Sequence, residues 1–291
     1  MKITKAVIPA AGLGTRVLPA SKAVPKEMLP IVDKPALQYL IEEAVDSGIT
    51  DILVITNRGK SIIEDHFDRN IPLEESLLAS NKKDLYDSII RTHKLANISY
   101  IRQIETNGLG HAVSKAKAFV GNEPFAILYG DDVVYGGKSP ATKELIDAYG
   151  EFGKGVLGIK EVPEDEIFKF SSLKVENIHD NVYKCTDMIE KPQSKEAVLS
   201  CFSILGRCIL PPEIFDILSE TKPGRGGEIQ LTDAMKVLAN TYGMTAVEYT
   251  GEHLDMGSKI GMLKASIKVG LEHKEIGEEL RKYIKEIAEN L

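Results

Sequence analysis

The sequence has no long hydrophobic run: no stretch approaches the roughly 20 apolar residues that cross a membrane as a helix. It has no excess of positive charge either, because its formal net charge at pH 7 is −7. A chain without an overall basic field is a poor partner for polyanions, so we expect neither nucleic acid nor a membrane as a partner. Basic residues that cluster locally would then serve a small anionic ligand.

Cysteine is scarce, and no signal-peptide pattern precedes the first predicted strand. The three cysteines, Cys185, Cys201 and Cys208, are odd in number and form no Cys-x-x-Cys pair. This cysteine usage favours a reduced, cytoplasmic setting.

What the sequence does contain is ordinary for a globular protein. Of its 291 residues, 43% are apolar and 27% are charged. This length is enough for one large α/β domain or two smaller ones. We find no linker, low-complexity segment or internal repeat, which favours one domain with appendages.

Strand and helix patterns alternate through the first half of the chain. Apolar runs predict strands over 6–9, 51–56, 98–102 and 125–128, and helical spacing predicts helices over 35–47, 61–67, 71–97 and 110–120. Within 71–97 the expected inner side chains are Leu85, Ile89 and Ile90. The alternation predicts an α/β fold with a doubly wound, largely parallel sheet and ligands at the carboxyl ends of its strands.

From about residue 155 the pattern changes. Strand-like segments at 156–159, 173–175, 182–189 and 203–210 have little helix between them, and they predict a mixed extension of the sheet that forms the far wall of a pocket. Helical spacing returns at 211–218 and 231–239, and 244–249 is one more strand.

The tail repeats apolar residues at intervals typical of helix faces. These residues are Ile260, Leu263, Ile267, Leu271, Ile276, Leu280, Ile284, Ile287 and Leu291. Packing against the sheet and packing against another subunit explain this pattern equally well.

A glycine-rich turn, Ala10-Ala11-Gly12-Leu13-Gly14-Thr15-Arg16, follows the first apolar run. Backbone N–H groups on such a turn form a concave anion site, and basic residues just after it can neutralise phosphates. We therefore expect a nucleotide-phosphate site, although the turn alone is more typical of a simple bend. Val17 stands where the dinucleotide fingerprint has its third Gly or Ala, and the Gly-Lys-Ser/Thr ending of a Walker loop is missing.

Charged residues with the chemistry of phosphoryl transfer lie at three other places. Lys26 lies between Pro25 and Pro30, and a rigid loop there could hold it against a phosphoryl group; a solvated surface lysine is the alternative. Two predicted strands end in carboxylates, at Asp131-Asp132 and at Asp255. Mg²⁺ typically takes one or two carboxylates together with phosphate oxygens and water, which makes Asp131 and Asp132 candidate metal ligands, with a loop acid pair as the alternative. Asp255 by itself is no better than a turn signal.

Two further segments suit a base and a sugar. Gln103 precedes a second glycine turn, 108–112, where a flat base could lie against the backbone while the amide pairs with its polar edge. A simple helix start with His111 in its first turn explains this segment equally well. Glu190 and Lys191 close a strand, and adjacent strand residues point to opposite faces. Both reach one ligand only if the chain bends there, which Pro192 favours.

Together and in this order, these segments resemble the bacterial UTP–glucose-1-phosphate uridylyltransferases, which are sugar-1-phosphate nucleotidylyltransferases. The segments are 10–16, Pro25-Lys26-Glu27-Met28-Leu29-Pro30-Ile31, Gly108-Leu109-Gly110-His111-Ala112, Gly130-Asp131-Asp132, Glu190-Lys191-Pro192 and Gly227-Glu228-Ile229-Gln230-Leu231-Thr232-Asp233. The resemblance covers nearly the whole chain. It implies a Rossmann-like fold and the attack of glucose 1-phosphate on the α-phosphorus of UTP, giving UDP-glucose and pyrophosphate with Mg²⁺ as the cofactor.

The resemblance also implies a role for each site residue. Lys26 would stabilise the α-phosphoryl transition state, Arg16 would face the β- and γ-phosphates, and Asp131 and Asp255 would bind Mg²⁺. The implied nucleotide-binding residues are Ala10, Ala11, Gly12, Gly14, Gln103, Gly108 and Asp132, of which Gln103 and Gly108 would read the uracil. The implied sugar-phosphate residues are Glu190, Lys191 and Ser171.

The resemblance implies one catalytic domain over residues 1–257, with a nucleotide half over about 1–135 and a sugar half over about 155–257. Residues 258–291 would form a helical tail and a candidate oligomer contact in a homodimer or homotetramer. Two departures lie on the sugar side: Phe170-Ser171 replaces the family's usual Tyr-Gly, and Ser200-Cys201 its usual Ser-Asn. The serine could narrow the pocket or supply a new hydrogen bond.

The departures leave a second acceptor open, namely another hexose 1-phosphate such as galactose 1-phosphate. Thymidylyl transfer is disfavoured, because that related family usually starts its turn with Gly-Gly where this chain has Ala10-Ala11. A catalytically weak homologue that binds a UDP-sugar as a regulator is the alternative from another class. The joint presence of Lys26, Asp131 and Asp255 argues against it.

Overall fold

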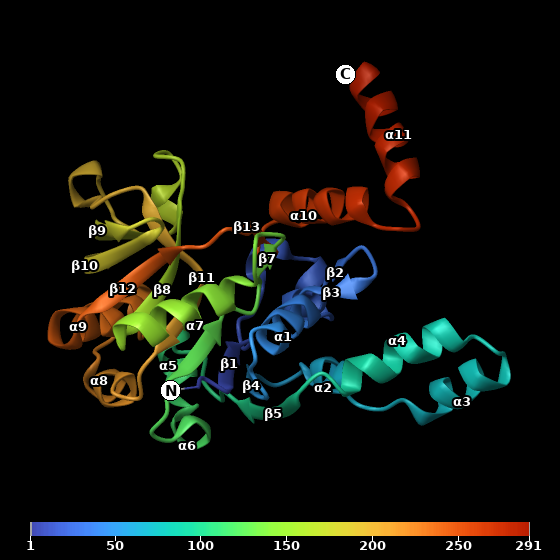
Figure 1. Cartoon of the computed structure of the whole chain (residues 1–291), viewed down its shortest axis with the longest axis horizontal. Helices are drawn as coiled ribbons and strands as arrows, with labels where there is room; N and C mark the ends of the chain where they lie inside the picture. The colour runs from blue at the N-terminus through green and yellow to red at the C-terminus, as the bar shows by residue number, and fades with distance from the viewer. Residues whose placement is uncertain (1, 291) are drawn as a thin grey trace.

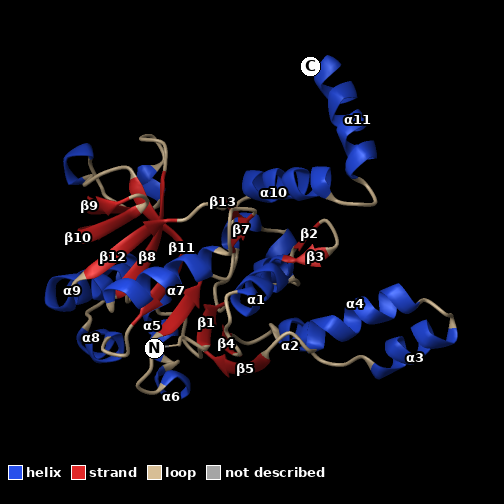
Figure 2. Ribbon diagram, viewed as in Figure 1, coloured by secondary structure: helices blue, strands red, loops and turns tan. Residues whose placement is uncertain are grey.

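The computed structural model describes residues 2–290. The strands of its central sheet are β1 Lys5–Pro9, β4 Asp51–Thr56, β5 Asn97–Arg102, β6 Phe125–Leu128, β8 Gly155–Glu161, β9 Ser171–His179, β10 Val182–Glu190, β11 Phe202–Leu210 and β12 Met244–Glu248. They lie in the order β5-β4-β1-β6-β11-β8-β12-β10-β9 (Figure 2). Only β10 and β11 of these nine run against the others, so the mostly parallel α/β sheet with a mixed extension is confirmed.

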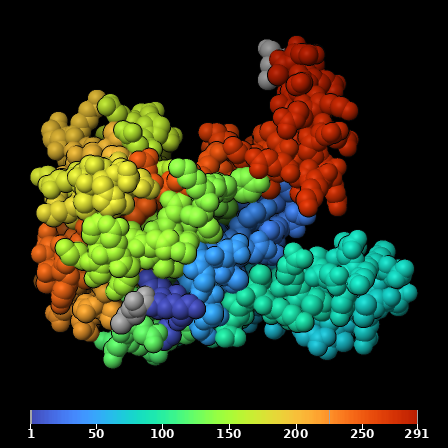
Figure 3. All heavy atoms as spheres, in the orientation of Figure 1, coloured from blue at the N-terminus to red at the C-terminus, as the bar shows by residue number. Residues whose placement is uncertain are grey.

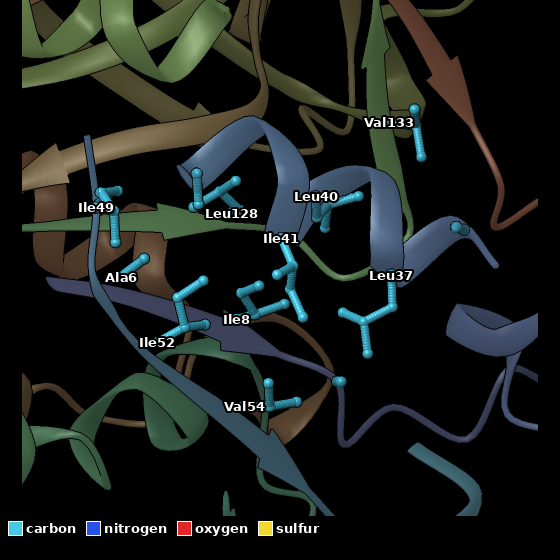
Figure 4. Packing of buried hydrophobic residues seen from close by; sticks show 14 of the residues in the cluster. Ala6, Ile8, Leu37, Leu40, Ile41, Ile49, Ile52, Val54, Leu128 and Val133 are labelled. Atoms are coloured by element: carbon cyan, nitrogen blue, oxygen red, sulfur yellow. The ribbon is translucent and has the colours of Figure 1, made fainter. Parts of the chain in front are cut away.

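Helices cover both faces of this sheet (Figure 1). They are α1 Ala36–Asp46, α2 Ser61–Phe67, α5 Leu109–Ser114, α6 Lys117–Val120, α7 Ala141–Phe152, α8 Ile214–Glu220 and α9 Leu231–Tyr242. Alternate residues of β1 serve the two faces: Ile8 packs with Leu40 and Ile41 of α1, whereas Val7 packs with the cluster that contains Phe215 of α8 (Figure 4). The chain therefore folds as a three-layer helix–sheet–helix sandwich.

Parallel strands bring their carboxyl ends to one edge of the sheet. The loops that follow β1, β4, β5 and β6 begin at Ala10, Asn57, Gln103 and Tyr129 and therefore meet there. A separate antiparallel pair, β7 Asp132–Tyr135 and β13 Glu252–Asp255, places Asp255 opposite Asp132. This pair delivers a carboxylate from the far end of the chain to the same edge.

The predicted helix over 71–97 is two helices, α3 Ile71–Ala79 and α4 Lys83–His93. Asn81, at φ 54°, breaks the helix between them. The prediction that Leu85 lies inside is wrong, because its side chain is 55% exposed. The hairpin of α3 and α4 projects from the body of the molecule (Figure 3) and lies beyond the edge of the sheet, so α4 has no sheet face to cover (Figure 1).

Helix α7 was not predicted from the sequence, although it contributes Leu145 and Ala148 to the core. Pro140 precedes its first residue, and Gly153 ends it at φ 62°. Both are ordinary boundary signals of a helix, and they could have revealed it.

The tail forms α10 Lys259–Glu272 and α11 Gly277–Glu289, which project from the body of the molecule (Figure 3). Helix α10 packs on β13 and on β2 Pro30–Ile31, a strand that pairs with β3 Lys34–Pro35. Of the predicted apolar residues, Ile260 and Leu263 are each 61% exposed, and Leu291 lies outside the described residues. Within residues 2–290, none of the helices is both long and apolar enough to cross a membrane.

One buried ion pair connects the sheet to helix α1 beneath the edge formed by the carboxyl ends of the parallel strands, called the ligand edge below. Arg207 of β11, which is 1% exposed, donates from Nε and Nη2 to the two carboxylate oxygens of Glu43 in α1, at 2.9 and 2.6 Å. Its Nη1 donates to the carbonyl of Asp132 at 2.8 Å. Thr142 of α7 donates to Glu43 from its hydroxyl at 2.7 Å. Burial disfavours the Glu43 carboxylate, but Arg207 and Thr142 outweigh it and hold the pKa of Glu43 below its usual range.

Removing one member of this pair should be costly. Glu43→Leu leaves the Arg207 guanidinium buried without its counter-charge, so the free energy of unfolding in urea should fall by about 3–5 kcal/mol. The double variant Glu43→Leu/Arg207→Met buries neither charge and should lose clearly less. Equal losses in the two variants would contradict the assignment of an interdependent pair.

Candidate active site

Two cavities adjoin at the ligand edge of the sheet. The first has a volume of about 410 Å³ and is lined by Gly12, Gln103 and Gly108 among others. The second has a volume of about 800 Å³ and is lined by residues of the mixed extension. Lys26 and Asp131 line both cavities, so they lie where the two meet.

The first glycine turn forms one wall of the first cavity, which Ala11, Gly12 and Leu13 line. Gly14 turns the chain at φ 66°, a backbone conformation that side chains disfavour. Ala10 is fully buried beneath this wall.

Lys26 begins the short 3₁₀ turn Lys26–Met28 after Pro25. Its Nζ lies 2.5 Å from Asp131 Oδ2, and Arg16 Nη2 lies 3.5 Å from the same oxygen. Burial lowers the pKa of Lys26, but Asp131 and Glu27 outweigh burial and raise it. Lys26 therefore keeps its positive charge at the junction of the cavities.

Asp131 and Asp255 flank a single point. A methyl group on Gly257 would collide with Asp131 Oδ2 and Arg16 Nη2 and would lie 3.0 Å from Asp255 Oδ1. The amide of Met256 donates to the carbonyl of Asp131 at 2.8 Å, which fixes the two segments together. The described residues form no cluster of three or more carboxylate, histidine or cysteine side chains that could hold a metal by themselves.

At the first cavity, Gln103 is 3% exposed and its amide nitrogen is bonded within the protein. It donates to the carbonyl of Gly108 at 3.2 Å and lies 2.9 Å from His111 Nδ1. Gly108 has φ 99°, and a Cβ there would lie 2.8 Å from the carbonyl oxygen of Ile229. Glycine is required at this close approach, because the 228–229 segment closes over the turn.

At the second cavity, the predicted bend after Glu190 is confirmed, because Lys191 has φ 47°. Both side chains line the second cavity, and Thr232 donates to Glu190 Oε2 at 2.7 Å. A glutamate and a lysine that are neighbours in sequence therefore face the same space.

Ser171 also lines the second cavity but directs its hydroxyl into the sheet. Its Oγ accepts from the amide of Ile204 at 3.1 Å and lies 3.2 Å from Ser203 Oγ. Cys201 lies elsewhere, beside a smaller cavity that it shares with Phe168 and Val198.

Asp132 lines the second cavity only, whereas Gln103 and Gly108, which were predicted to bind the nucleotide together with it, line the first. Its Oδ1 lies 2.8 Å from Nε2 of His253. Burial alone would raise the pKa of Asp132, but His253 and Arg207 outweigh burial and lower it.

Sequence reasoning missed several residues at this edge. Lys60 and Glu27 form a buried ion pair at 2.9 Å behind the glycine turn, and burial raises the pKa of Glu27 against the opposing charges of Lys60 and Lys26. His253 and Thr232 hold Asp132 and Glu190. The position of Lys60, just past the carboxyl end of a predicted parallel strand, was the one available signal.

Known proteins share this architecture. A family model described as nucleotidyl transferase matches residues 5–270. The UTP–glucose-1-phosphate uridylyltransferase 1 of Staphylococcus saprophyticus is 46% identical over 287 residues, which cover 99% of each chain. The UTP–glucose-1-phosphate uridylyltransferase of Staphylococcus epidermidis is 46% identical over 286 residues, covering 98% of this chain and 99% of that one.

Solved structures agree with these relatives. A UDP-glucose pyrophosphorylase in complex with UDP-glucose superimposes with a TM-score of 0.86 at 39% identity, covering 94% of this chain and all of that one. A UTP-bound enzyme of the same kind from Acinetobacter baumannii gives a TM-score of 0.91 at 38% identity, covering 98% and 99% of the two chains. The chain therefore belongs to the nucleotidyl transferase family and, within it, to the UTP–glucose-1-phosphate uridylyltransferases.

Proposed function

We propose that this protein transfers UMP from UTP to glucose 1-phosphate, giving UDP-glucose and pyrophosphate. The observation that carries the proposal is the meeting of two cavities at Lys26 and Asp131. A transferase needs two sites that share one wall, because the reacting phosphorus and the attacking oxygen belong to different substrates. The joint presence of Lys26, Asp131 and Asp255 at this wall argues against a protein that only binds a finished UDP-sugar.

In the proposed reaction, a phosphate oxygen of glucose 1-phosphate attacks the α-phosphorus of UTP in line with the departing pyrophosphate. The attacking phosphate is already ionised, so no protein base is required. Lys26 stabilises the charge on the α-phosphoryl group in the transition state, and Arg16 faces the β- and γ-phosphates. Catalysis then depends on positioning and on the neutralisation of charge.

Gln103 and Gly108 read the base in this proposal. Because the amide nitrogen of Gln103 is committed to Gly108 and His111, its oxygen is the group left for the ligand. That oxygen can accept from the N3–H of uracil, whereas the N3 of cytosine is itself an acceptor. The arrangement thus favours UTP over CTP. Ala11 and Gly12 present backbone, and Ala10 and Gly14 shape the turn.

In the second cavity, Glu190 accepts from sugar hydroxyls and Lys191 pairs with the sugar phosphate. Asp132, which the resemblance assigned to the nucleotide, borders this half of the site. Ser171 shapes the sugar pocket through its Cβ, because its hydroxyl is committed to Ile204.

The chemistry of Asp131 and Asp255 fits Mg²⁺. Two carboxylates that flank one point, next to a phosphate site, match the usual donors for this ion, with phosphate oxygens and water as the remaining ligands. When bound there, Mg²⁺ would screen the repulsion between two anionic substrates. Lys26, which already contacts Asp131, would remain beside it.

We also propose the catalytic domain over 1–257, with its two halves as defined above, and the tail over 258–291 as a subunit contact in a dimer or tetramer. The support is the exposed apolar face of α10. Sedimentation velocity of the intact chain should show one of these assemblies, and Leu263→Lys should weaken it; a monomeric intact chain would contradict the proposal. The three free thiols support a reducing, cytoplasmic location, which cell fractionation tests.

The direct test is pyrophosphate release from a panel of nucleoside triphosphates and sugar 1-phosphates, each with Mg²⁺ and with EDTA. UTP with glucose 1-phosphate should be the fastest pair, and EDTA should stop the reaction. A higher kcat/KM with galactose 1-phosphate would show that this sugar phosphate is the preferred acceptor. Pyrophosphate release that persists in EDTA would show that the reaction needs no metal. Silence across the panel would leave a UDP-sugar-binding protein.

Lys26→Ala should lower kcat/KM by about 10²–10³, because it removes a charge aimed at the transition state. Lys22→Ala is the matched control, since Lys22 is an exposed lysine of the same segment and lines neither cavity. Circular dichroism should show both variants folded. Near-normal turnover by Lys26→Ala would refute its role.

Ser171→Gly should lower the KM for glucose 1-phosphate, because it removes the Cβ from the pocket wall. Ser171→Ala keeps the Cβ and should leave that KM within about twofold, since the hydroxyl accepts from the amide of Ile204 in the sheet and does not face the sugar pocket. A large rise in KM for Ser171→Ala would show instead that the hydroxyl reaches the sugar.

A further inference from the structure

Three successive carbonyl groups of the glycine turn are held by side chains from one neighbouring segment. Lys60 Nζ donates to the carbonyl of Ala10 at 2.5 Å and to that of Gly12 at 2.7 Å. Between them, Asn57 Nδ2 donates to the carbonyl of Ala11 at 2.5 Å. Asn57 and Lys60 both come from the loop between β4 and α2, so a single loop binds the carbonyl side of the turn.

In a trans peptide unit, the C=O and the N–H point in opposite directions. Holding the carbonyls of Ala10, Ala11 and Gly12 toward the interior therefore turns the N–H groups of residues 11–13 the other way. Residues 11, 12 and 13 all line the first cavity. Across residues 2–290, none of these three N–H groups donates to a protein acceptor.

Lys60 cannot serve the ligand directly. An ammonium group has three donors, and Lys60 commits all of them, two to the carbonyls and the third to Glu27 Oε2 at 2.9 Å. Its side chain is 8% exposed and lines neither cavity. Glu27, which is 1% exposed, completes the arrangement from the position next to Lys26.

We propose that Asn57, Lys60 and Glu27 form a clamp that aims three backbone N–H groups at the phosphates of the nucleoside triphosphate. These side chains are positioning residues, because they act through the turn and touch no substrate. The inference rests on the proposed function for the identity of the ligand and adds the residues that fix the geometry of its phosphate site.

The clamp has a consequence that a merely structural ion pair lacks. Its loss should weaken binding of the triphosphate and leave recognition of the base and of the sugar phosphate intact, because those contacts come from other segments. Removing Lys60 alone would leave Glu27 buried with an unpaired charge and would destabilise the fold. The double variant Glu27→Gln/Lys60→Met avoids this, and Asn57→Ala removes one donor without changing any charge.

Calorimetry should show that Glu27→Gln/Lys60→Met binds UTP about tenfold to a hundredfold more weakly, and Asn57→Ala about threefold to tenfold more weakly. Uridine, measured by competition, should bind all variants equally. In turnover, the KM for UTP should rise while that for glucose 1-phosphate stays constant. Lys5→Met is the control, because Lys5 donates to the carbonyl of Val120 at 3.0 Å and pairs with Glu123, away from both cavities.

Unchanged UTP affinity in both clamp variants, or equal losses for UTP and uridine, would overturn the inference. Binding of UTP by the unmodified protein without turnover would overturn the proposed reaction alone, and the calorimetric comparison would still decide the clamp. An unmodified protein that binds no UTP would overturn both.

Discussion

The contact between Lys26 and Asp131 is the interaction on which the rest of this site depends. Two anionic substrates must approach within bonding distance, and they repel each other. Mobile water does not provide a positive charge held between them. A single cation at the wall shared by the two cavities can face both substrates. The fold holds that cation by placing Lys26 on a short turn after Pro25 and by anchoring its partner Asp131 in the turn between β6 and β7.

Around this contact, the two halves of the site come from different parts of the sheet. The first cavity is lined by loops that follow the parallel strands β1, β5 and β6, whereas the second cavity is lined in part by residues of the mixed extension. Arg207 of β11 connects the two parts from beneath. It binds the carboxylate of Glu43 in α1 and the carbonyl of Asp132, the first residue of β7. The same buried charge pair thus supports the core and fixes one wall of the cavities.

Most of the fold could be predicted from the sequence, because buried parallel strands are continuous apolar runs. The run 51–56 coincides with β4, and 125–128 coincides with β6. The prediction that Leu85 is buried failed for a physical reason. Helical periodicity identifies an apolar face but not what covers it, and the α3–α4 hairpin lies beyond the sheet. The position of Lys60 after a predicted strand could have drawn attention to it, but its role could not be predicted, because that role depends on three acceptors from two distant segments, Ala10, Gly12 and Glu27.

Two glycines of the site, Gly108 and Gly110, pack its two cavities against each other. Gly108 and Gly110 both lie against Ile229, and the amide of Gly110 donates to the carbonyl of that residue at 2.8 Å. Glu228, the residue before it, lines both cavities. The turn over 108–112 and the boundary of the second cavity are therefore one packed unit, in which a side chain at position 108 or 110 would displace both walls. Glycine at these positions is a requirement of the close packing between the halves, in addition to any contact with the base.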